Sequence, residues 1–181
     1  MEAEKNIKKA DFGVLAGIEE MLSAPDLGIG PDVVIVVSSC EDGASFWQKR
    51  LTGADGVHGS GGIVKPSAVV LSVSESNWHG SAGNALGTIN AFYEAGRMAM
   101  ELGLVRPSGD DIDRIFSIFS NFLKDKSAFM FHTAGKGTRL SPLTAAEHNS
   151  KSRIKLPGMV HTREGQEPIT VLEAAIRAAG I

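Results

Sequence analysis

The sequence predicts an α/β fold in which a mostly parallel sheet carries helices on both faces. Two runs rich in β-branched residues, at 32–39 and 68–74, are apolar on both faces, which is typical of parallel strands that helices cover on each side. A third apolar run, at 128–131, is expected to be a buried strand and leads into a glycine-rich loop. Helical periodicity between these runs makes strands and helices alternate, as they do in α/β proteins.

We expect helices in the segments around the strands. Apolar residues recur at helical spacing in residues 7–23, 41–51, 86–102, 109–125 and 168–179. In the segment 109–125 an apolar stripe should face the core; its members are Ile112, Ile115, Phe116, Phe119, Phe122 and Leu123. The last helix begins near Pro168 or Thr170, and we expect it to leave apolar surface exposed, which favours self-association or contact with further sequence.

Length and composition indicate one domain. The chain has 181 residues, of which 43% are hydrophobic and 22% are charged, an ordinary balance for a globular protein. We divide it into an N-terminal helix at 1–30, a βαβα unit at 31–105, and a last part at 106–181 that contains a helix, the third strand with its loop, and the C-terminal helix.

Charge and cysteine content limit the partners and the compartment. The net charge of −3 gives no basic field, so a nucleic acid polymer is not an expected partner. No window holds the ~18 uninterrupted apolar residues of a membrane span, so we expect no contact with a membrane. The one cysteine, Cys40, suits a reducing compartment, and we expect the protein in the cytoplasm.

The loop after the third strand carries the strongest chemical signal. Gly135 and Gly137 let the backbone approach a phosphate closely, and consecutive backbone N–H groups form a concavity that binds anions. Arg139 and Lys151 add cations that neutralise a polyphosphate. We expect the polar segment 145–157 to fold over this site. The plain alternative is a tight turn with a solvated arginine.

Two common glycine-rich nucleotide motifs are excluded. A Walker A loop requires Ser or Thr directly after its Gly-Lys pair and a further glycine five residues before the pair. This chain has Gly137 and Met130 at those positions. A dinucleotide-binding fingerprint requires a third glycine at the position of Leu140.

Residues 135–144 match every fixed position of another signature, Gly-x-Gly-Thr-Arg-Leu-x-Pro-Leu-Thr followed by a lysine. This stretch resembles the sugar-phosphate nucleotidyltransferases, the family of UTP–glucose-1-phosphate uridylyltransferase and related sugar-nucleotide pyrophosphorylases. The resemblance implies a Rossmann-like, nucleotidyltransferase-like fold, here incomplete. It also implies transfer of a nucleotidyl group from a nucleoside triphosphate, with UTP favoured, to a sugar-1-phosphate, with release of pyrophosphate and with Mg²⁺ as cofactor.

The resemblance gives roles to the loop and to the residues after it. Nucleotide binding falls to Ala134, Gly135, Lys136, Gly137, Thr138 and Lys155. Arg139 would hold the departing pyrophosphate, and Lys151 would neutralise charge near the α-phosphate. Lys151 fits the family's lysine by its spacing, whereas Lys155 competes because it precedes Leu-Pro, so either can hold that position.

A second, shorter match lies at residues 83–88. The run Gly-Asn-Ala-Leu-Gly-Thr is similar to the Leu-Gly-Thr segment that opens a helix in the same family. Asn84, Gly87 and Thr88 are therefore expected beside the base or the sugar. The alternative is a glycine-rich helix start whose small residues only allow close packing of the helix on a strand.

The order of these pieces is unusual for the family, because residues 32–102 precede the signature instead of following it. Either the chain is permuted around one shared parallel sheet, which we favour, or its first half is a separate α/β unit. The family's metal-binding Asp has no match, Glu75 is a weak substitute, and the metal ligand stays unknown. The chain is then an N-terminal portion or a degenerate short homologue. The alternative function is a non-catalytic module or subunit that binds a nucleotide or a nucleotide sugar.

Overall fold

The computed structural model describes residues 30–60, 62–77, 83–106, 112–133, 145–147 and 150–179, with residues 83, 84 and 146 described by their backbone alone. The helix expected at 7–23 and the residues 134–144, which we call the signature loop, lie outside these ranges.

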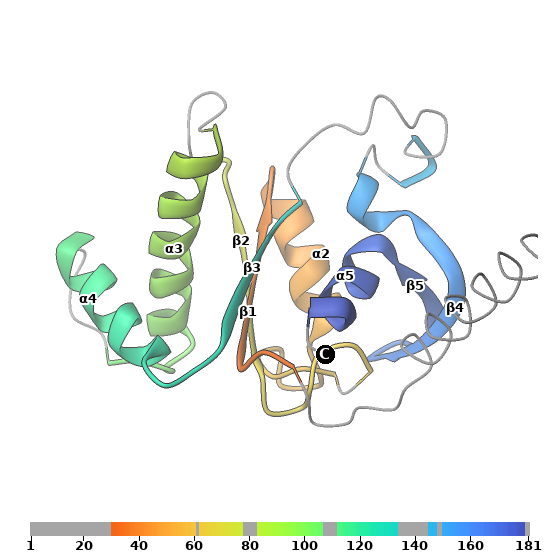
Figure 1. Ribbon diagram of the computed structural model, residues 1–181, viewed down its shortest axis with the longest axis horizontal. Helices are drawn as coiled ribbons and strands as arrows, with labels where there is room; N and C mark the ends of the chain where they lie inside the picture. The colour runs from red at the N-terminus through yellow and green to blue at the C-terminus, as the bar shows by residue number, and fades with distance from the viewer. Residues whose placement is uncertain are drawn as a thin grey trace, which may run out of the picture.

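Three parallel strands form the central sheet (Figure 1). They are β1 (Val33–Ser38), β2 (Val69–Ser74) and β3 (Ala128–His132), in the order β2-β1-β3. Val36 in the middle of β1 lies opposite Ser72 of β2 and opposite Phe131 of β3. The strands of both halves of the chain therefore lie in one parallel sheet.

Helices cover both faces of this sheet (Figure 1). The helix α2 (Glu41–Leu51) packs on one face, and α3 (Gly83–Glu101) packs on the other with α4 (Ile112–Leu123) beside it. Because side chains alternate along a strand, each strand contributes to two cores. The α2 core contains Val34, Val36, Val70, Trp47 and Leu51, and the α3 core contains Val33, Ile35, Leu71, Ala91, Ala95, Ala99 and Phe119.

A smaller layer packs on the α2 side of the sheet (Figure 1). Its strands β4 (Lys155–Thr162) and β5 (Gly165–Thr170) form an antiparallel hairpin, which leads into α5 (Val171–Ala179). Two short 3-10 turns, η2 (Ala145–Glu147) and η3 (Lys151–Arg153), precede the hairpin.

This layer corrects one prediction from the sequence and narrows another. The polar segment predicted at 145–157 runs into β4 from Lys155. Of the two starts predicted for the last helix, Pro168 lies in β5, whereas Thr170 directly precedes α5. The sequence does not reveal β4, because Pro157 and Gly158 interrupt the alternation of apolar and polar residues by which a strand is recognised. Gly158 has a φ of 149°, and the pairing with β5 shifts register between Lys155 and Met159.

Three predictions about burial are also wrong. The strand β3 is not fully buried, since it lies at an edge of the described sheet and Phe129 is 36% exposed. Ile112 does not face the core, because it is the first residue of α4 and is 59% exposed. The apolar face of α5 is covered, since Leu172 and Ile176 are buried in the α2 core.

A buried ionic network joins the hairpin and α5 to α2. Arg50 Nε donates to Glu173 Oε1 at 2.6 Å, Nη2 donates to the Pro168 carbonyl at 2.9 Å, and Nη1 pairs with Glu167. Glu173 is wholly buried and also accepts from the Thr170 N–H at 2.7 Å, in a capping box that starts α5. Burial, the largest single effect, lowers the pKa of the Arg50 guanidinium, but the hydrogen bonds with Glu173 and the charges of the neighbouring glutamates together outweigh it and raise that pKa.

Asp32 ties together the amino ends of β1 and β3. Its carboxylate accepts hydrogen bonds from Lys65 Nζ at 2.8 Å, from the Ser127 N–H at 2.8 Å and from Ser127 Oγ at 2.9 Å. These donors, with Lys65 the largest contribution, hold the pKa of the Asp32 carboxyl well below its ordinary value of 3.8.

Arg50→Ala should strongly destabilise the protein, because it leaves the wholly buried Glu173 without its cation. Removing one partner of a buried ion pair costs about 3–5 kcal/mol in the free energy of unfolding. The matched control is Lys49→Ala, since Lys49 and Glu164 form a pair in which both side chains are more than half exposed. That control should change the free energy by less than about 1 kcal/mol. Urea unfolding measures both variants, and equal effects would contradict the network's role.

Asp32→Asn should destabilise the protein in a pH-dependent way. A carboxyl whose pKa is lower in the folded state stabilises that state above its unfolded pKa, and this contribution is lost as the pH falls through the folded pKa. The difference between the wild type and the variant should therefore be largest at neutral pH and shrink below 3.8, the ordinary value for Asp32. Urea unfolding from pH 7 to about pH 2 tests this, and a constant difference would show that the charge is not the cause.

Candidate functional site

The carboxyl ends of the three parallel strands meet at one edge of the sheet, which is where open α/β sheets bind their ligands. At this edge β1 ends in Ser38, β2 is followed by Glu75, and β3 ends in His132. The chain leaves β1 toward α2 and leaves β2 toward α3, on opposite faces of the sheet (Figure 1). The carboxyl ends of β1 and β2 therefore lie between two connections that run to opposite faces of the sheet.

Three polar side chains from different elements meet at this edge, and we call them the edge cluster: Glu75 after β2, Thr88 in α3 and His132 at the end of β3. His132 Nε2 lies 3.1 Å from Thr88 Oγ1, within hydrogen-bond distance. His132 Nδ1 lies 3.7 Å from Glu75 Oε1, which is too far for a hydrogen bond but close for a pair of opposite charges. The cluster stays open to solvent, since the His132 side chain is 35% exposed and the Glu75 side chain is 22% exposed.

Gly87 makes room for the Glu75 carboxylate. A Cβ atom at this position would lie 2.7 Å from Glu75 Oε1 and 3.9 Å from His132 Cε1. The carboxylate therefore occupies the space over the early part of α3 that the missing side chain leaves open. An alanine here would require the carboxylate to move, so the glycine permits this close approach and is not needed for an unusual backbone angle.

The strand end that leads to the signature loop is held by its own hydrogen bonds. The Thr133 N–H donates to the Val37 carbonyl at 2.8 Å, and Thr133 Oγ1 donates to the same carbonyl at 2.9 Å. Thr133 Oγ1 also lies 3.3 Å from Ser38 Oγ. On the other side of β1, the Glu75 N–H donates to the Ser38 carbonyl at 2.8 Å. These contacts fix the backbone at the two points where the chain leaves the sheet, after β2 and after β3.

The structure brings part of the predicted site together. Gly87 and Thr88 lie in the edge cluster, against the last residue of the strand that leads to the signature loop. Asn84 lies in the first turn of α3, where only its backbone is described. Outside the described residues lie Ala134, Gly135, Lys136, Gly137, Thr138 and Arg139.

The two candidate lysines lie elsewhere. Lys151 is exposed in η3, and Lys155 is exposed in β4, where its Nζ lies 3.6 Å from Glu147 Oε1. Figure 1 shows η3 and β4 on the α2 side of the sheet, whereas α3 lies on the other side. The structure therefore does not join either lysine to the edge cluster.

His132 is the member of the cluster that the sequence did not single out, and Glu75 appeared only as a weak metal ligand. A usable signal exists, because both residues directly follow or end an apolar run that reads as a parallel strand. Polar residues at the carboxyl ends of the strands of one parallel sheet are expected at the same edge. Their pairing could not be predicted, because it depends on β1 lying between β2 and β3.

The described part of the chain contains no large cluster of metal-binding side chains. Among those residues, no three His, Cys, Asp or Glu side chains are placed to hold a metal ion together. Among the described residues, the edge cluster therefore offers two side chains to a metal ion, Glu75 and His132.

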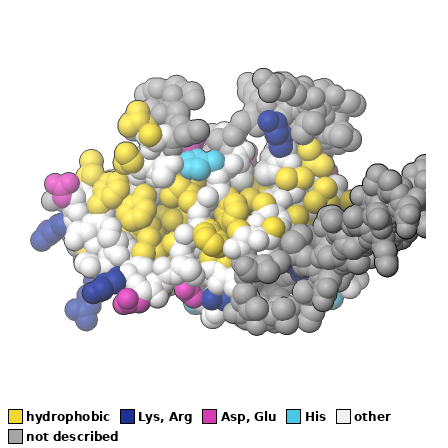
Figure 2. All heavy atoms as spheres, in the orientation of Figure 1, with side chains coloured by type: hydrophobic (Ala, Val, Ile, Leu, Met, Phe, Trp, Pro, Cys, Tyr) yellow, Lys and Arg dark blue, Asp and Glu magenta, His cyan; other side chains and the backbone are white. Residues whose placement is uncertain are grey.

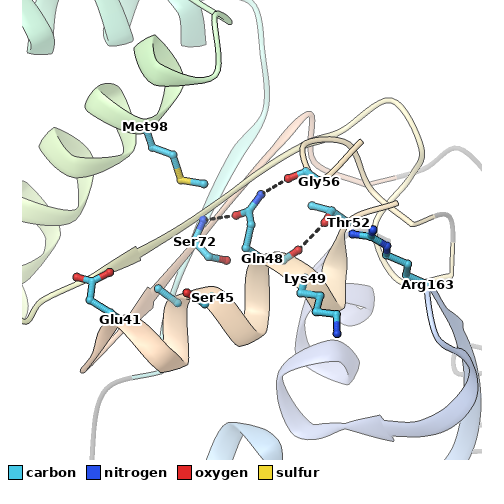
Figure 3. Close-up of a pocket in the computed structure, with 10 residues that line it drawn as sticks. Glu41, Ser45, Gln48, Lys49, Thr52, Gly56, Ser72, Met98 and Arg163 are labelled. Carbon is cyan, nitrogen blue, oxygen red and sulfur yellow. Dashed lines mark hydrogen bonds between the residues drawn. The ribbon is translucent and has the colours of Figure 1, made fainter. Parts of the chain in front are cut away.

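A separate cavity of about 370 Å³ lies beside the outer edge of β2 (Figure 3). Its central side chain, Gln48, is fully engaged: Nε2 donates to the carbonyls of Gly56 at 2.8 Å and Val70 at 2.9 Å, and Oε1 accepts from the Ser72 N–H at 2.8 Å. Gln48 thus takes the place of a further strand on this edge. Lys49, also in the lining, pairs with Glu164. Because these polar groups close the open edge of β2, we do not take this cavity as a ligand site.

Comparison with protein-family models, with curated proteins and with solved structures finds no match for this chain. No helix in the part of the chain that the structure describes has the length and apolar character needed to cross a membrane.

Gly87→Ala should move the Glu75 carboxylate without unfolding the protein, because the end of a flexible side chain can swing away from the new methyl group. The free energy of unfolding should change by no more than about 1 kcal/mol, since Ala also favours the helix. The His132 ring resonances should shift in an NMR spectrum, because the neighbouring charge has moved.

The matched control is Gly96→Ala in the same helix. Its Cβ would lie 2.8 Å from Ile115 Cγ2 and 3.2 Å from Phe119 Cβ, inside the packed contact of α3 with α4. Overpacking there should destabilise the protein by about 1–3 kcal/mol and leave the His132 resonances in place. Unshifted His132 resonances in Gly87→Ala would show that the carboxylate does not sit over Gly87.

Proposed function

We propose that this chain binds a nucleoside triphosphate, with UTP favoured, and transfers its nucleotidyl group to a sugar-1-phosphate to form a nucleotide sugar. The contact between Thr88 and His132, at 3.1 Å, carries the proposal. It brings the second matching segment, residues 83–88, to the end of the strand that precedes the signature loop, although the two residues are 44 positions apart in the sequence. The early part of α3 and the end of the strand that leads to the signature loop thus lie together at the carboxyl edge of the sheet.

The reaction consists of attack by a phosphate oxygen of the sugar-1-phosphate on the α-phosphorus, with pyrophosphate leaving. The attacking group is already an anion, so the protein's task is to position the reactants and to stabilise charge. Arg139 holds the pyrophosphate, and Lys151 or Lys155 neutralises charge near the α-phosphate. Mg²⁺, when bound, neutralises the phosphates. The backbone of residues 134–138, with Asn84, Gly87 and Thr88, holds the nucleotide.

The proposal extends to the fold and the compartment. The order β2-β1-β3, with helices on both faces, supports a Rossmann-like nucleotidyltransferase-like sheet. In such sheets the ligand lies outside the carboxyl ends of the strands, which is where the edge cluster lies. A cytoplasmic location agrees with the single cysteine.

A second candidate is a module that binds the nucleotide without turnover. The position of Lys151 and Lys155 on the α2 side of the sheet favours it (Figure 1). A lysine that stays there contributes no charge at the edge cluster. Binding alone needs only the loop backbone and Arg139, whereas nucleotidyl transfer also needs a cation near the α-phosphate.

The test combines calorimetry and a pyrophosphate-release assay on the full chain. UTP should bind in the presence of Mg²⁺ more tightly than dTTP, CTP, ATP or GTP, and addition of glucose-1-phosphate should release pyrophosphate. A preference for a purine nucleotide would contradict the assignment of uridylyl transfer. UTP binding without pyrophosphate release would favour the binding module.

Arg139→Ala should weaken UTP binding by about 1.5–3 kcal/mol, the contribution of a hydrogen bond to a charged group. The matched control is Arg106→Ala, which removes an exposed arginine that follows α3 at its far end. The control should leave the affinity unchanged. Equal affinities for Arg139→Ala and the wild type would remove Arg139 from the pyrophosphate-binding role.

A further inference from the structure

We propose that Glu75 and His132 bind a divalent cation of the Mg²⁺ and Mn²⁺ class at the carboxyl edge of the sheet. The protein ligands are Glu75 Oε1 and His132 Nδ1, and the remaining positions are filled by water and by phosphate oxygens of a nucleotide. Only the phosphate ligands rest on the proposed function. The two protein ligands follow from the geometry of the edge cluster.

The distance between the two donor atoms is longer than a hydrogen bond and is close to the spacing of two ligands on one ion. Two ligands bound at about 2.1 Å, with an angle between octahedral and tetrahedral at the metal, lie roughly 3.0–3.4 Å apart. The observed separation of Glu75 Oε1 and His132 Nδ1 is 3.7 Å. A small inward shift of either side chain closes this gap. Both side chains are partly exposed, at 22% and 35%, so water and phosphate can reach the ion.

Thr88 supplies the orientation that a metal-binding histidine requires. Such a histidine almost always has its other ring nitrogen hydrogen-bonded, which fixes the tautomer and the ring. Here Nε2 lies 3.1 Å from Thr88 Oγ1, and the opposite nitrogen, Nδ1, faces the carboxylate. With the proton on Nε2 donated to Thr88, Nδ1 presents its lone pair to the cation.

The backbone holds the two ligands in place. Glu75 follows β2, and its N–H donates to the Ser38 carbonyl at 2.8 Å. His132 is the last residue of β3 and is paired with Val37 of β1. Gly87 keeps open the space that the carboxylate occupies, since a Cβ there would lie 2.7 Å from Oε1. Three elements therefore fix the site before any cation binds.

The ligand set selects the kind of cation. Mg²⁺ usually takes one or two carboxylates and completes its shell with substrate phosphates and water. An imidazole ligand shifts the preference toward transition metals, while the carboxylate and water keep Mn²⁺ suitable. We therefore expect Mn²⁺ to bind more tightly than Mg²⁺. This site also supplies the metal ligand that the sequence leaves unidentified.

The experiment measures Mn²⁺ binding to the full 181-residue chain without nucleotide, from the electron paramagnetic resonance signal of free Mn²⁺. The wild type should bind one Mn²⁺. Thr88→Val should raise the dissociation constant about 10–100-fold, as loss of a partner of a metal ligand does. Glu75→Gln and His132→Asn should raise it at least as much. Circular dichroism checks that each variant is folded.

The matched control is Glu41→Gln, which removes another carboxylate near the same edge. Glu41 accepts a hydrogen bond from Ser76 Oγ at 2.9 Å, and it lies outside the edge cluster. This variant should bind Mn²⁺ like the wild type. Gly87→Ala keeps both metal ligands but displaces the carboxylate, so it should weaken binding. Unchanged Mn²⁺ affinity in Glu75→Gln, or an equal loss in Glu41→Gln, would overturn the site.

Failure of the metal site and failure of the proposed function give different results. Mn²⁺ binding that depends on Glu75, in a chain that neither binds UTP nor releases pyrophosphate, supports the metal site and removes the nucleotidyltransferase assignment. Pyrophosphate release by the wild type, together with unchanged Mn²⁺ affinity in Glu75→Gln, leaves the assignment in place and removes the metal site.

Discussion

The complete burial of β1 is the constraint on which the rest of the structure depends. Every residue from Val33 to Ser38 is buried, with exposures between 0% and 3%. A strand buried in this way needs a hydrogen-bonded neighbour at each edge and an apolar layer on each face. The strands β2 and β3 meet the first need, and α2 and α3 meet the second. Because β2 and β3 both run parallel to β1, their carboxyl ends lie at the same edge, where the cluster forms.

The two outer edges of the sheet differ, and this difference separates the candidate site from the cavity of Figure 3. On the β2 side, the Gln48 amide bonds the strand's backbone groups as a further strand would. Its polar atoms are thus used for the fold. On the β3 side, His132 is partly exposed and Phe129 reaches the surface. Figure 2 likewise shows hydrophobic side chains at the surface among polar ones on one face of the molecule.

The hairpin layer is tied to the sheet by charge as well as by apolar packing. Arg50 of α2 reaches three groups of the β5–α5 segment, and Glu173 satisfies both that arginine and the start of α5. A buried carboxylate with these partners leaves little freedom in how α5 sits on α2. Residues after the signature loop are thereby anchored on the α2 side, which accounts for the position of Lys155 away from the edge cluster.

Local pattern in the sequence is enough to predict several elements of this protein. Unbroken apolar runs predict β1 and β2, helical spacing predicts α2, α3 and α4, and the Gly87-Thr88 pair makes the start of α3 a candidate site. It did not predict β4, because Pro157 and Gly158 break the alternation, nor the partial exposure of β3, because edge position is not encoded in the strand's own residues. Only the tertiary structure placed Glu75, Thr88 and His132 together. These residues lie together because the strand order is β2-β1-β3. That order arises because β1 is buried between two strands that are distant from each other in the sequence.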